Sequence, residues 1–235
     1  MKQKKRFNQS ERGVSMVEIL VVVVIIGILS AITAMSLRTP PKYNAENQAF
    51  TLTDMMREAQ QRSLSQKKTM RVVINSSDRV ISLINENEPA DANNDGVNDA
   101  PTANNDTVIK TATFTDNNMS IGVVPTNMTA SPVELSPVTP IVFANSIHPL
   151  SLGDVVATMR FRSNGTVLNA GNDAIGTGAT PTGATIYVWT KRDSDTSANP
   201  TEADILRAVT VLGSSGSTKL WKCGVANNQC TTWTR

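Results

Sequence analysis

The chain has 235 residues and a formal net charge of +2 at pH 7, which allows one soluble domain behind an N-terminal anchor. Five of the 22 basic residues but only one of the 20 acidic residues lie within residues 1–13, so the rest of the chain has 17 basic and 19 acidic side chains. The positive balance is therefore a property of the N-terminus and gives no reason to expect a nucleic-acid-binding protein. Two cysteines and a single histidine, with no further ligands beside them, argue against a zinc site.

The most apolar segment runs from Gly13 to Leu37, and from Ile19 onward it contains no charged residue. At about 1.5 Å per residue, a helix of this length matches a hydrocarbon core of about 30 Å, so we predict a transmembrane helix over residues 14–39. The preceding basic residues hold the N-terminus in the cytoplasm and send the rest of the chain outward. A secretory signal peptide has a shorter apolar region with a small-residue cleavage site after it, which is not the order found here.

One carboxylate, Glu18, lies near the start of the apolar segment. A charge costs about 2.5–3.5 kcal/mol at the bilayer centre on insertion scales, and less at the interface. Glu18 is therefore either an interfacial residue whose side chain reaches water or a carboxylate that is kept for a partner.

The N-terminal pattern resembles the signature of type IV prepilins. It consists of a short basic segment, then Gly13, an apolar residue (Val14) and Glu18 at the fifth position after the glycine. The resemblance implies that a membrane prepilin peptidase cleaves after Gly13 and methylates the new N-terminus at Val14. It also implies that Glu18 neutralises the terminal amine of a neighbouring subunit as helices pack into a filament. That family usually has Phe at the position of Val14 and a Thr-Leu-Ile run at residues 15–17, where this chain has SMV; both changes keep the chemical character.

After the apolar segment, Pro40 and Pro41 are expected to interrupt or kink the helix because neither donates an amide hydrogen bond. Helical periodicity then resumes, and we predict an amphipathic helix over residues 40–67. Its small and apolar positions are three or four residues apart and should face a core: Ala49, Leu52, Met56, Ala59 and Ser63.

Residues 68–235 are predicted to form a β domain. The runs TMRVVIN and VISLI flank the turn residues SSDR and indicate a hairpin. A polar segment, residues 85–107, is predicted to be a loop. Short β-branched runs then recur about every ten residues, which indicates antiparallel strands: 108–114, 120–124, 140–144, 155–162, 185–190, 206–212 and 218–222.

The C-terminal region, from MRFRSNGTVLN through TIYVWT to ILRAVTVLGSSGSTKLW, resembles the GspH/FimT group of minor pilins and pseudopilins. In that group a Phe-x-x-x-Gly turn precedes two strands and a glycine-containing hairpin, and Phe161 and Gly165 occupy the turn positions here. The long polar segment 85–107 is not typical of the group.

Within the polar segment, DANNDGVND matches the early positions of a calcium-binding loop. Carboxylate, amide and carbonyl oxygens that alternate in this way can surround Ca²⁺, and Gly96 permits the sharp turn. The predicted ligands are Asp91, Asn93, Asp95, Val97 and Asp99. The usual glutamate at the twelfth position is replaced by Thr102, with Asp106 or Asn104 as substitutes. The alternative is a solvated loop, since Asn, Asp and Gly are simply turn-forming residues.

Near the C-terminus, Cys223 and Cys230 lie close enough in sequence to form a disulfide in a protein exported from the cytoplasm. Aromatic and basic residues lie near the two cysteines: Trp221, Lys222, Trp233 and Arg235. They either form a patch that binds DNA or cover a small core beside the disulfide. We expect the second arrangement because the basic residues are few. His148 has no carboxylate or serine arrangement near it in sequence, so we expect a structural or surface histidine and not a catalytic base.

The predicted fold class is therefore α+β, with a long N-terminal helix, half transmembrane and half amphipathic, packed on an antiparallel β domain. The resemblance implies a minor type IV pilin or a type II secretion pseudopilin that assembles with other pilins. We expect residues 1–13 to be the leader, no enzymatic activity, and no cofactor except possible Ca²⁺. The protein would be a single-pass inner-membrane protein with a periplasmic domain, or part of a pilus or pseudopilus. The alternatives are a membrane-anchored DNA-uptake pilin or a periplasmic binding module that does not polymerise.

Overall fold

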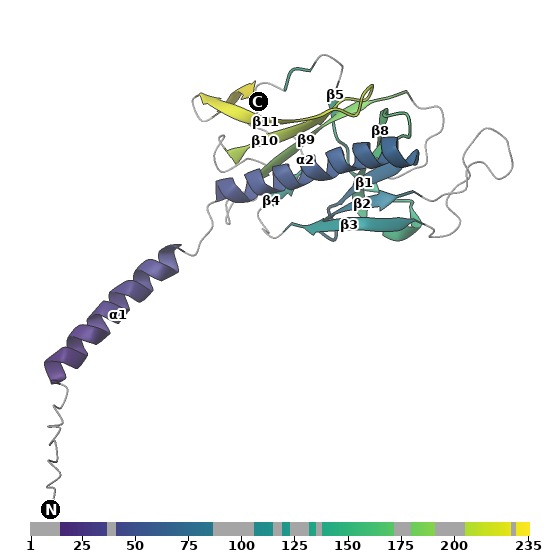
Figure 1. Ribbon diagram of the computed structural model, residues 1–235. Helices are drawn as coiled ribbons and strands as arrows, with labels where there is room; N and C mark the ends of the chain where they lie inside the picture. The colour runs from purple at the N-terminus through teal and green to yellow at the C-terminus, as the bar shows by residue number, and fades with distance from the viewer. Residues whose placement is uncertain are drawn as a thin grey trace, which may run out of the picture. The chain divides into compact units, whose positions relative to one another are not determined.

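The computed structural model describes residues 15–36, 41–86, 106–114, 119–122, 132–134, 138–171, 180–190, 205–226 and 229–235. The chain divides into two compact units, residues 1–40 and residues 41–235. The first unit contains helix α1 (Met16–Ser36), and the second contains helix α2 (Pro41–Gln66) and all the strands (Figure 1).

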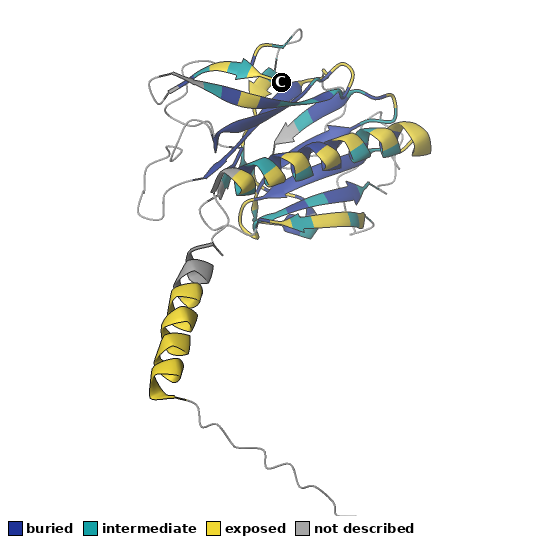
Figure 2. Cartoon of the chain, turned by 60° about the vertical axis from the view of Figure 1, so that its left-hand side comes forward, coloured by how far each residue is buried: buried dark blue, intermediate teal, exposed yellow. Residues whose placement is uncertain are grey.

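Helix α1 begins directly after Ser15, which caps it. The Ser15 hydroxyl accepts a hydrogen bond from the Val17 N–H at 3.3 Å, and its carbonyl accepts one from the Glu18 N–H at 2.9 Å. All side chains described from Ser15 to Ser30 are exposed, as Figure 2 shows. Among the residues that the structure describes, no helix meets the criteria of length and apolarity for a candidate membrane span.

The second unit contains two six-stranded sheets. Sheet A has the order β3-β2-β1-β7-β6, with β8 also pairing with β7, and its strands are β1 (Met70–Asn75), β2 (Val80–Asn85), β3 (Thr107–Thr113), β6 (Ala144–Asn145), β7 (Val155–Phe161) and β8 (Val167–Gly171). Sheet B has the order β12-β11-β10-β9-β4, with β5 also pairing with β9, and its strands are β4 (Met119–Ile121), β5 (Val138–Pro140), β9 (Gly183–Thr190), β10 (Arg207–Val211), β11 (Thr218–Ala226) and β12 (Gln229–Thr234). All pairs are antiparallel except β5 with β9.

Helix α2 packs against strands of both sheets, so the helix and the two sheets share one hydrophobic core (Figure 1). The helix begins at Pro41, where proline is well tolerated because an N–H in the first turn has no partner within the helix. The predicted core stripe is confirmed, since all five of its residues are buried: Ala49, Leu52, Met56, Ala59 and Ser63. The opposite face of α2 is exposed (Figure 2).

Most predicted strands are confirmed, and the turn of the β1–β2 hairpin is Ser76–Arg79. The single strand predicted over 140–144 is wrong, because that stretch joins β5 in sheet B to β6 in sheet A. Strands β8 and β12 were not predicted. The predicted polar loop overlaps the ends of β2 and β3, and residues 87–105 lie outside the described part of the chain.

Gly165 and Gly216 are two of the described glycines whose positive φ favours a residue without a side chain. Gly165 has φ 85° in the turn after Phe161, and its N–H donates to the Arg162 carbonyl at 2.9 Å. Gly216 has φ 67° in the β10–β11 hairpin, and its N–H donates to the Leu212 carbonyl at 2.8 Å. The predicted turn at Phe161–Gly165 and the glycine-containing hairpin beyond it are therefore both present.

Candidate functional sites

The first candidate site is the start of α1, where Glu18 lies in the first helical turn. It lies three positions after the capping residue Ser15, which is the spacing of a capping box in which a glutamate supports the N-terminus of a helix. A carboxylate there also interacts favourably with the positive end of the helix dipole. The position of Glu18 thus suits a supporting role within its own helix, which the sequence interpretation did not include. Gly13 and Val14 lie outside the described residues.

The rest of α1 offers an apolar surface without a polar face. Its sequence contains no charged residue other than Glu18, and its described aliphatic side chains are about half exposed, for example Ile19 at 55% and Leu29 at 57%. A helix that is apolar all round is normally buried, either in lipid or among other helices. We therefore expect the exposed side chains in the described part of α1 to be buried by lipid or by other apolar helices.

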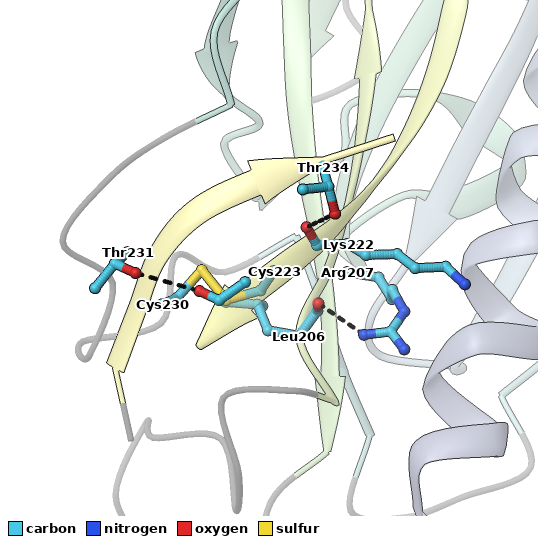
Figure 3. The surroundings of a disulfide bond; sticks show 8 residues. Leu206, Arg207, Lys222, Cys223, Cys230, Thr231 and Thr234 are labelled. Carbon is cyan, nitrogen blue, oxygen red and sulfur yellow. Dashed lines mark hydrogen bonds between the residues drawn. A yellow bond between two sulfur atoms is a disulfide. The ribbon is translucent and has the colours of Figure 1, made fainter. Parts of the chain in front are cut away.

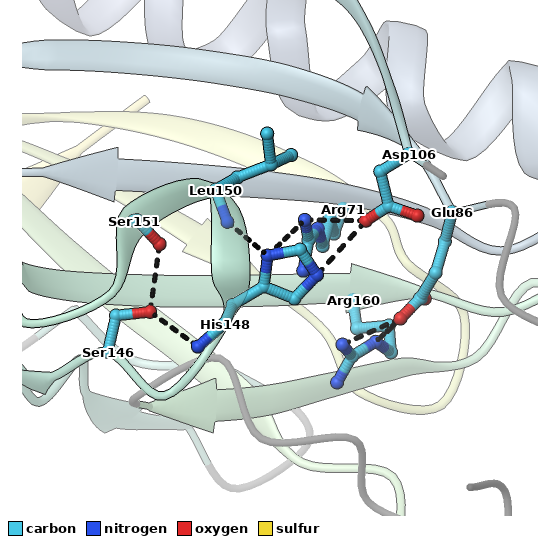
Figure 4. Close-up of polar contacts among 8 residues, drawn as sticks. All are labelled: Arg71, Glu86, Asp106, Ser146, His148, Leu150, Ser151 and Arg160. Atoms are coloured by element: carbon cyan, nitrogen blue, oxygen red, sulfur yellow. Dashed lines mark hydrogen bonds and ion pairs between the residues drawn. The ribbon is translucent and has the colours of Figure 1, made fainter. Parts of the chain in front are cut away.

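The second candidate site is a buried group of charged residues on sheet A, here called the loop-base cluster: Arg71, Glu86, Asp106, His148 and Arg160 (Figure 4). Arg71 on β1 and Arg160 on β7 face each other across the antiparallel pair, so two like charges lie side by side. Each of these two arginines forms an ion pair with a different carboxylate. Arg71 Nη2 lies 2.7 Å from Asp106 Oδ2, and Arg160 Nη2 lies 2.7 Å from Glu86 Oε1.

The two acidic residues of the loop-base cluster lie at the two ends of segment 87–105. Glu86 directly follows β2 and Asp106 directly precedes β3, next to the paired residues Asn85 and Thr107. Their side chains are almost fully buried, with exposures of 8% and 1%. Both ends of the polar segment are thus tied to neighbouring central strands by buried, charge-assisted contacts.

His148 completes the cluster, and both of its ring nitrogens have contacts within it. Its Nδ1 accepts the Leu150 N–H at 3.2 Å and lies 3.2 Å from Arg71 Nη2, which can only donate. On the other side of the ring, His148 Nε2 lies 3.2 Å from Asp106 Oδ2. This geometry differs from the sequence view that no carboxylate lies near His148.

Two serines also approach His148 but do not form a catalytic arrangement with it. Ser146 Oγ accepts the backbone N–H of His148 at 3.1 Å and lies 2.8 Å from Ser151 Oγ (Figure 4). The ring nitrogens contact Leu150, Arg71 and Asp106, whereas the serine hydroxyls contact each other and the His148 backbone, and His148 is only 1% exposed. The expected structural role of His148 agrees with this burial.

The predicted calcium ligands lie outside the described residues, so their geometry stays a prediction. Asp106, which was a substitute for the missing last ligand, already pairs with Arg71 and His148. The Asp106 carboxylate is therefore engaged within the loop-base cluster. In the described residues no group of His, Cys, Asp and Glu side chains is arranged to hold a metal ion.

The predicted disulfide between Cys223 and Cys230 is present and joins β11 to β12, with a Cα–Cα distance of 5.6 Å (Figure 3). Beside it lies a small second core of aromatic and aliphatic side chains, which includes Tyr187, Trp189 and Trp221, with Trp233 packed against it. Trp221 is only 6% exposed, and the Arg235 guanidinium lies 5.0 Å from the centre of its ring. Trp221 thus covers a core, as expected, and does not offer an open face for stacking a base.

The comparisons with known proteins concern the N-terminal segment. Residues 8–34 match the family model of the prokaryotic N-terminal methylation motif. The match includes Gly13, Val14 and Glu18 and supports a type IV pilin-like protein. No curated protein and no solved structure matches the chain.

Proposed function

We propose that this protein is a minor type IV pilin or a type II secretion pseudopilin that enters or primes a filament through α1. The observation that carries the proposal is the methylation-motif match over residues 8–34, which continues into an apolar helix with exposed side chains. Residues 14–39 would anchor the subunit in the inner membrane before assembly, with the β unit in the periplasm. The GspH/FimT-like order of the C-terminal turn and hairpin supports a minor subunit.

Processing is the first step of the proposal. Cleavage between Gly13 and Val14 would make Val14 the new N-terminus, one helical turn from Glu18. Mass spectrometry of the membrane-extracted protein should find a chain that begins with methylated Val14. A chain that begins after the apolar segment would contradict both the processing and the membrane anchor.

Glu18 would then act in assembly by pairing with the terminal amine of a neighbouring subunit. In a low-dielectric helix bundle such a pair is much stronger than in water. Removing one partner of a buried pair typically costs about 3–5 kcal/mol, because the other charge is left unpaired. That cost is large enough to exclude a subunit from a filament.

The capping geometry at Ser15 allows the assembly role to be separated from a local role in the helix. Glu18→Gln removes the charge but retains a side chain that suits a capping box. Ser15→Ala weakens the cap by about 1 kcal/mol but keeps the carboxylate. We expect Glu18→Gln, and not Ser15→Ala, to prevent co-purification with other pilins, while both variants are processed normally.

If Glu18→Gln still enters filaments at the wild-type level, the assembly role is wrong and Glu18 only supports its helix. The same conclusion follows if Ser15→Ala prevents co-purification with other pilins and Glu18→Gln does not. A protein that is processed and membrane-anchored but never co-purifies with pilins would favour a binding module that does not polymerise.

A further inference from the structure

The two sheets enclose a hollow where the β1–β2 turn approaches β4. Its volume is about 260 Å³, which is below the range of about 300–1,000 Å³ found for sites that bind drug-sized molecules. A ligand that fills it must be small. The hollow is lined by residues from both sheets and from the segments that connect them: Ile74, Ser76, Arg79, Phe114, Ser120, Ile121, Phe143 and Val155.

The floor of the hollow is apolar and continuous with the main core. Ile74, Phe114 and Ile121 are buried members of that core, and Phe143 packs against it. Phe143 occupies its position because Gly122 has no side chain, since a Cβ on Gly122 would lie 2.2 Å from the Phe143 ring. Gly122 also has φ 88°, so its backbone disfavours any larger residue.

The other lining residues supply polar groups and a positive charge. The Ser76 hydroxyl donates to the Val155 carbonyl at 2.8 Å, which fixes its position next to the hollow. Arg79 is held at the turn because its carbonyl accepts the Phe114 N–H at 2.9 Å. A guanidinium has five N–H donors, so Arg79 can bind an anion in addition to partners within the chain.

The described lining residues thus combine an apolar floor with one arginine and two serines, and no acidic side chain is among them. An arginine presents two parallel N–H groups that fit a carboxylate. We propose that the hollow binds a small aliphatic carboxylate, with its tail against Phe114, Ile121 and Phe143 and its carboxylate at Arg79. This activity is separate from filament assembly, because it uses only residues of the β unit.

The proposal is tested with short carboxylates on the full-length protein held in lipid nanodiscs, with empty nanodiscs as the blank. Ligand-observed saturation-transfer NMR measures the Kd of acetate, butanoate and hexanoate, and of 1-hexanol and hexylammonium. We expect each added methylene to tighten the Kd by up to about fourfold, the factor that corresponds to about 0.8 kcal/mol. If Arg79 contributes one charge-assisted contact, hexanoate should bind at least about tenfold more tightly than hexanol. Hexylammonium should then bind more weakly than either.

Two kinds of variant locate the binding. Arg79→Gln should remove the preference for hexanoate over hexanol and leave hexanol binding unchanged, and Arg79→Lys should restore part of it. Ser120→Phe, or Val155→Phe from the opposite wall, should abolish binding of both ligands by filling the hollow. Matched controls are Arg57→Gln and Thr139→Phe, which change residues outside the lining and should bind like the wild type.

Thermal unfolding shows whether Ser120→Phe and Val155→Phe are folded. Only a folded variant is used to judge where the ligand binds. Equal affinity of the wild type for hexanoate and hexanol would overturn the carboxylate assignment. Wild-type affinity in a folded filling variant would overturn the location. Neither result bears on co-purification of Glu18 variants with pilins, so failure here is distinguishable from failure of the proposed function.

Discussion

The two helices of the N-terminal region differ in where their apolar side chains go. In α2, Leu52 and Met56 are fully buried against the two sheets, and the polar residues Asp54 and Arg57 face solvent. In α1, leucine, isoleucine and valine side chains are exposed on all described positions, and Leu20 is 60% exposed. Similar residue types are therefore buried in one helix and exposed in the other.

This difference allows the folding stability of the β unit to be measured separately from assembly through α1. Burial of apolar side chains contributes most of the favourable free energy of folding. Changes on the buried face of α2 should therefore alter the stability of the β unit, and changes in α1 should alter anchoring or assembly. Tryptophan fluorescence can follow the β unit alone, because all three tryptophans lie in β9, β11 and β12.

The largest effect is expected when the same substitution is made in each helix. Leu52→Asp removes a fully buried side chain, at about 2–5 kcal/mol, and introduces a charge that costs several more when buried. The total reaches the usual stability of a whole domain, about 5–15 kcal/mol, so the β unit should unfold. Leu20→Asp should leave its fluorescence melting curve unchanged and reduce membrane retention of the chain. A comparable loss of β-unit stability from both substitutions would remove the distinction between the helices.

The next largest effect concerns buried charge in the β unit, for which α1 has no counterpart. Asp106→Ala should destabilise the unit by about 3–5 kcal/mol, because Arg71 would remain buried without its carboxylate. Urea unfolding measures the change, and Asp54→Ala on the exposed face of α2 is the control, with an expected effect below about 0.5 kcal/mol. A small loss for Asp106→Ala would mean that water replaces the carboxylate and that the loop-base cluster is not needed for stability.

A smaller effect is expected from the disulfide, which acts on the last strand of sheet B. The double variant Cys223→Ser, Cys230→Ser should lose about 2–3 kcal/mol, because the closed loop is short and its constraint on the unfolded chain is modest. Urea unfolding under oxidising conditions gives the difference. Reductant should lower the stability of the wild type to that of the variant and leave the variant unchanged. Equal stability of the oxidised and reduced wild type would show that the bond adds nothing.

The smallest effect is expected on the solvent side of α2. Partial burial raises the pKa of Glu58, but the hydrogen bond from Arg62 and the charges of Lys110 and Arg62 outweigh it, so the net pKa lies below its usual value of 4.5. A lowered pKa in the folded state means that the contribution to stability is present above pH 4.5 and is lost as the pH falls through the folded pKa. Glu58→Gln should therefore cost about 0.3–0.5 kcal/mol at pH 7 and nothing well below pH 4.5. Melting curves across that range test it, and a constant difference would contradict it.

Much of the fold was predictable because local patterns determine it. The spacing of Ala49, Leu52 and Met56 predicts the buried face of α2, and the SSDR turn predicts the β1–β2 hairpin. The single strand over 140–144 was wrong because one apolar run supplies a connection between the two sheets. Strand β12 was missed because its threonine-rich sequence is short and polar, and it is held by pairing to β11 and by the disulfide.

The candidate sites were predictable only where their residues are near in sequence. The processing motif and the Cys223–Cys230 bond depend on short spacings and could be predicted directly. The loop-base cluster could not, because Glu86 and Arg160 are 74 positions apart and meet only through the register of β1 with β7. Ser15 and Glu18 carry the capping-box pattern in the sequence, and that signal could have been used.

The position of Glu86 and Asp106 opposite each other has a practical consequence for protein engineering. The two residues that flank segment 87–105 are held by buried ion pairs, so β2 and β3 have contacts at this end that do not depend on the peptide between them. Doubling the length of a flexible loop adds only about 0.6 kcal/mol of closure cost. An epitope tag or a small binding peptide inserted between these two residues should therefore be displayed on the β unit while the sheet beneath it keeps its register.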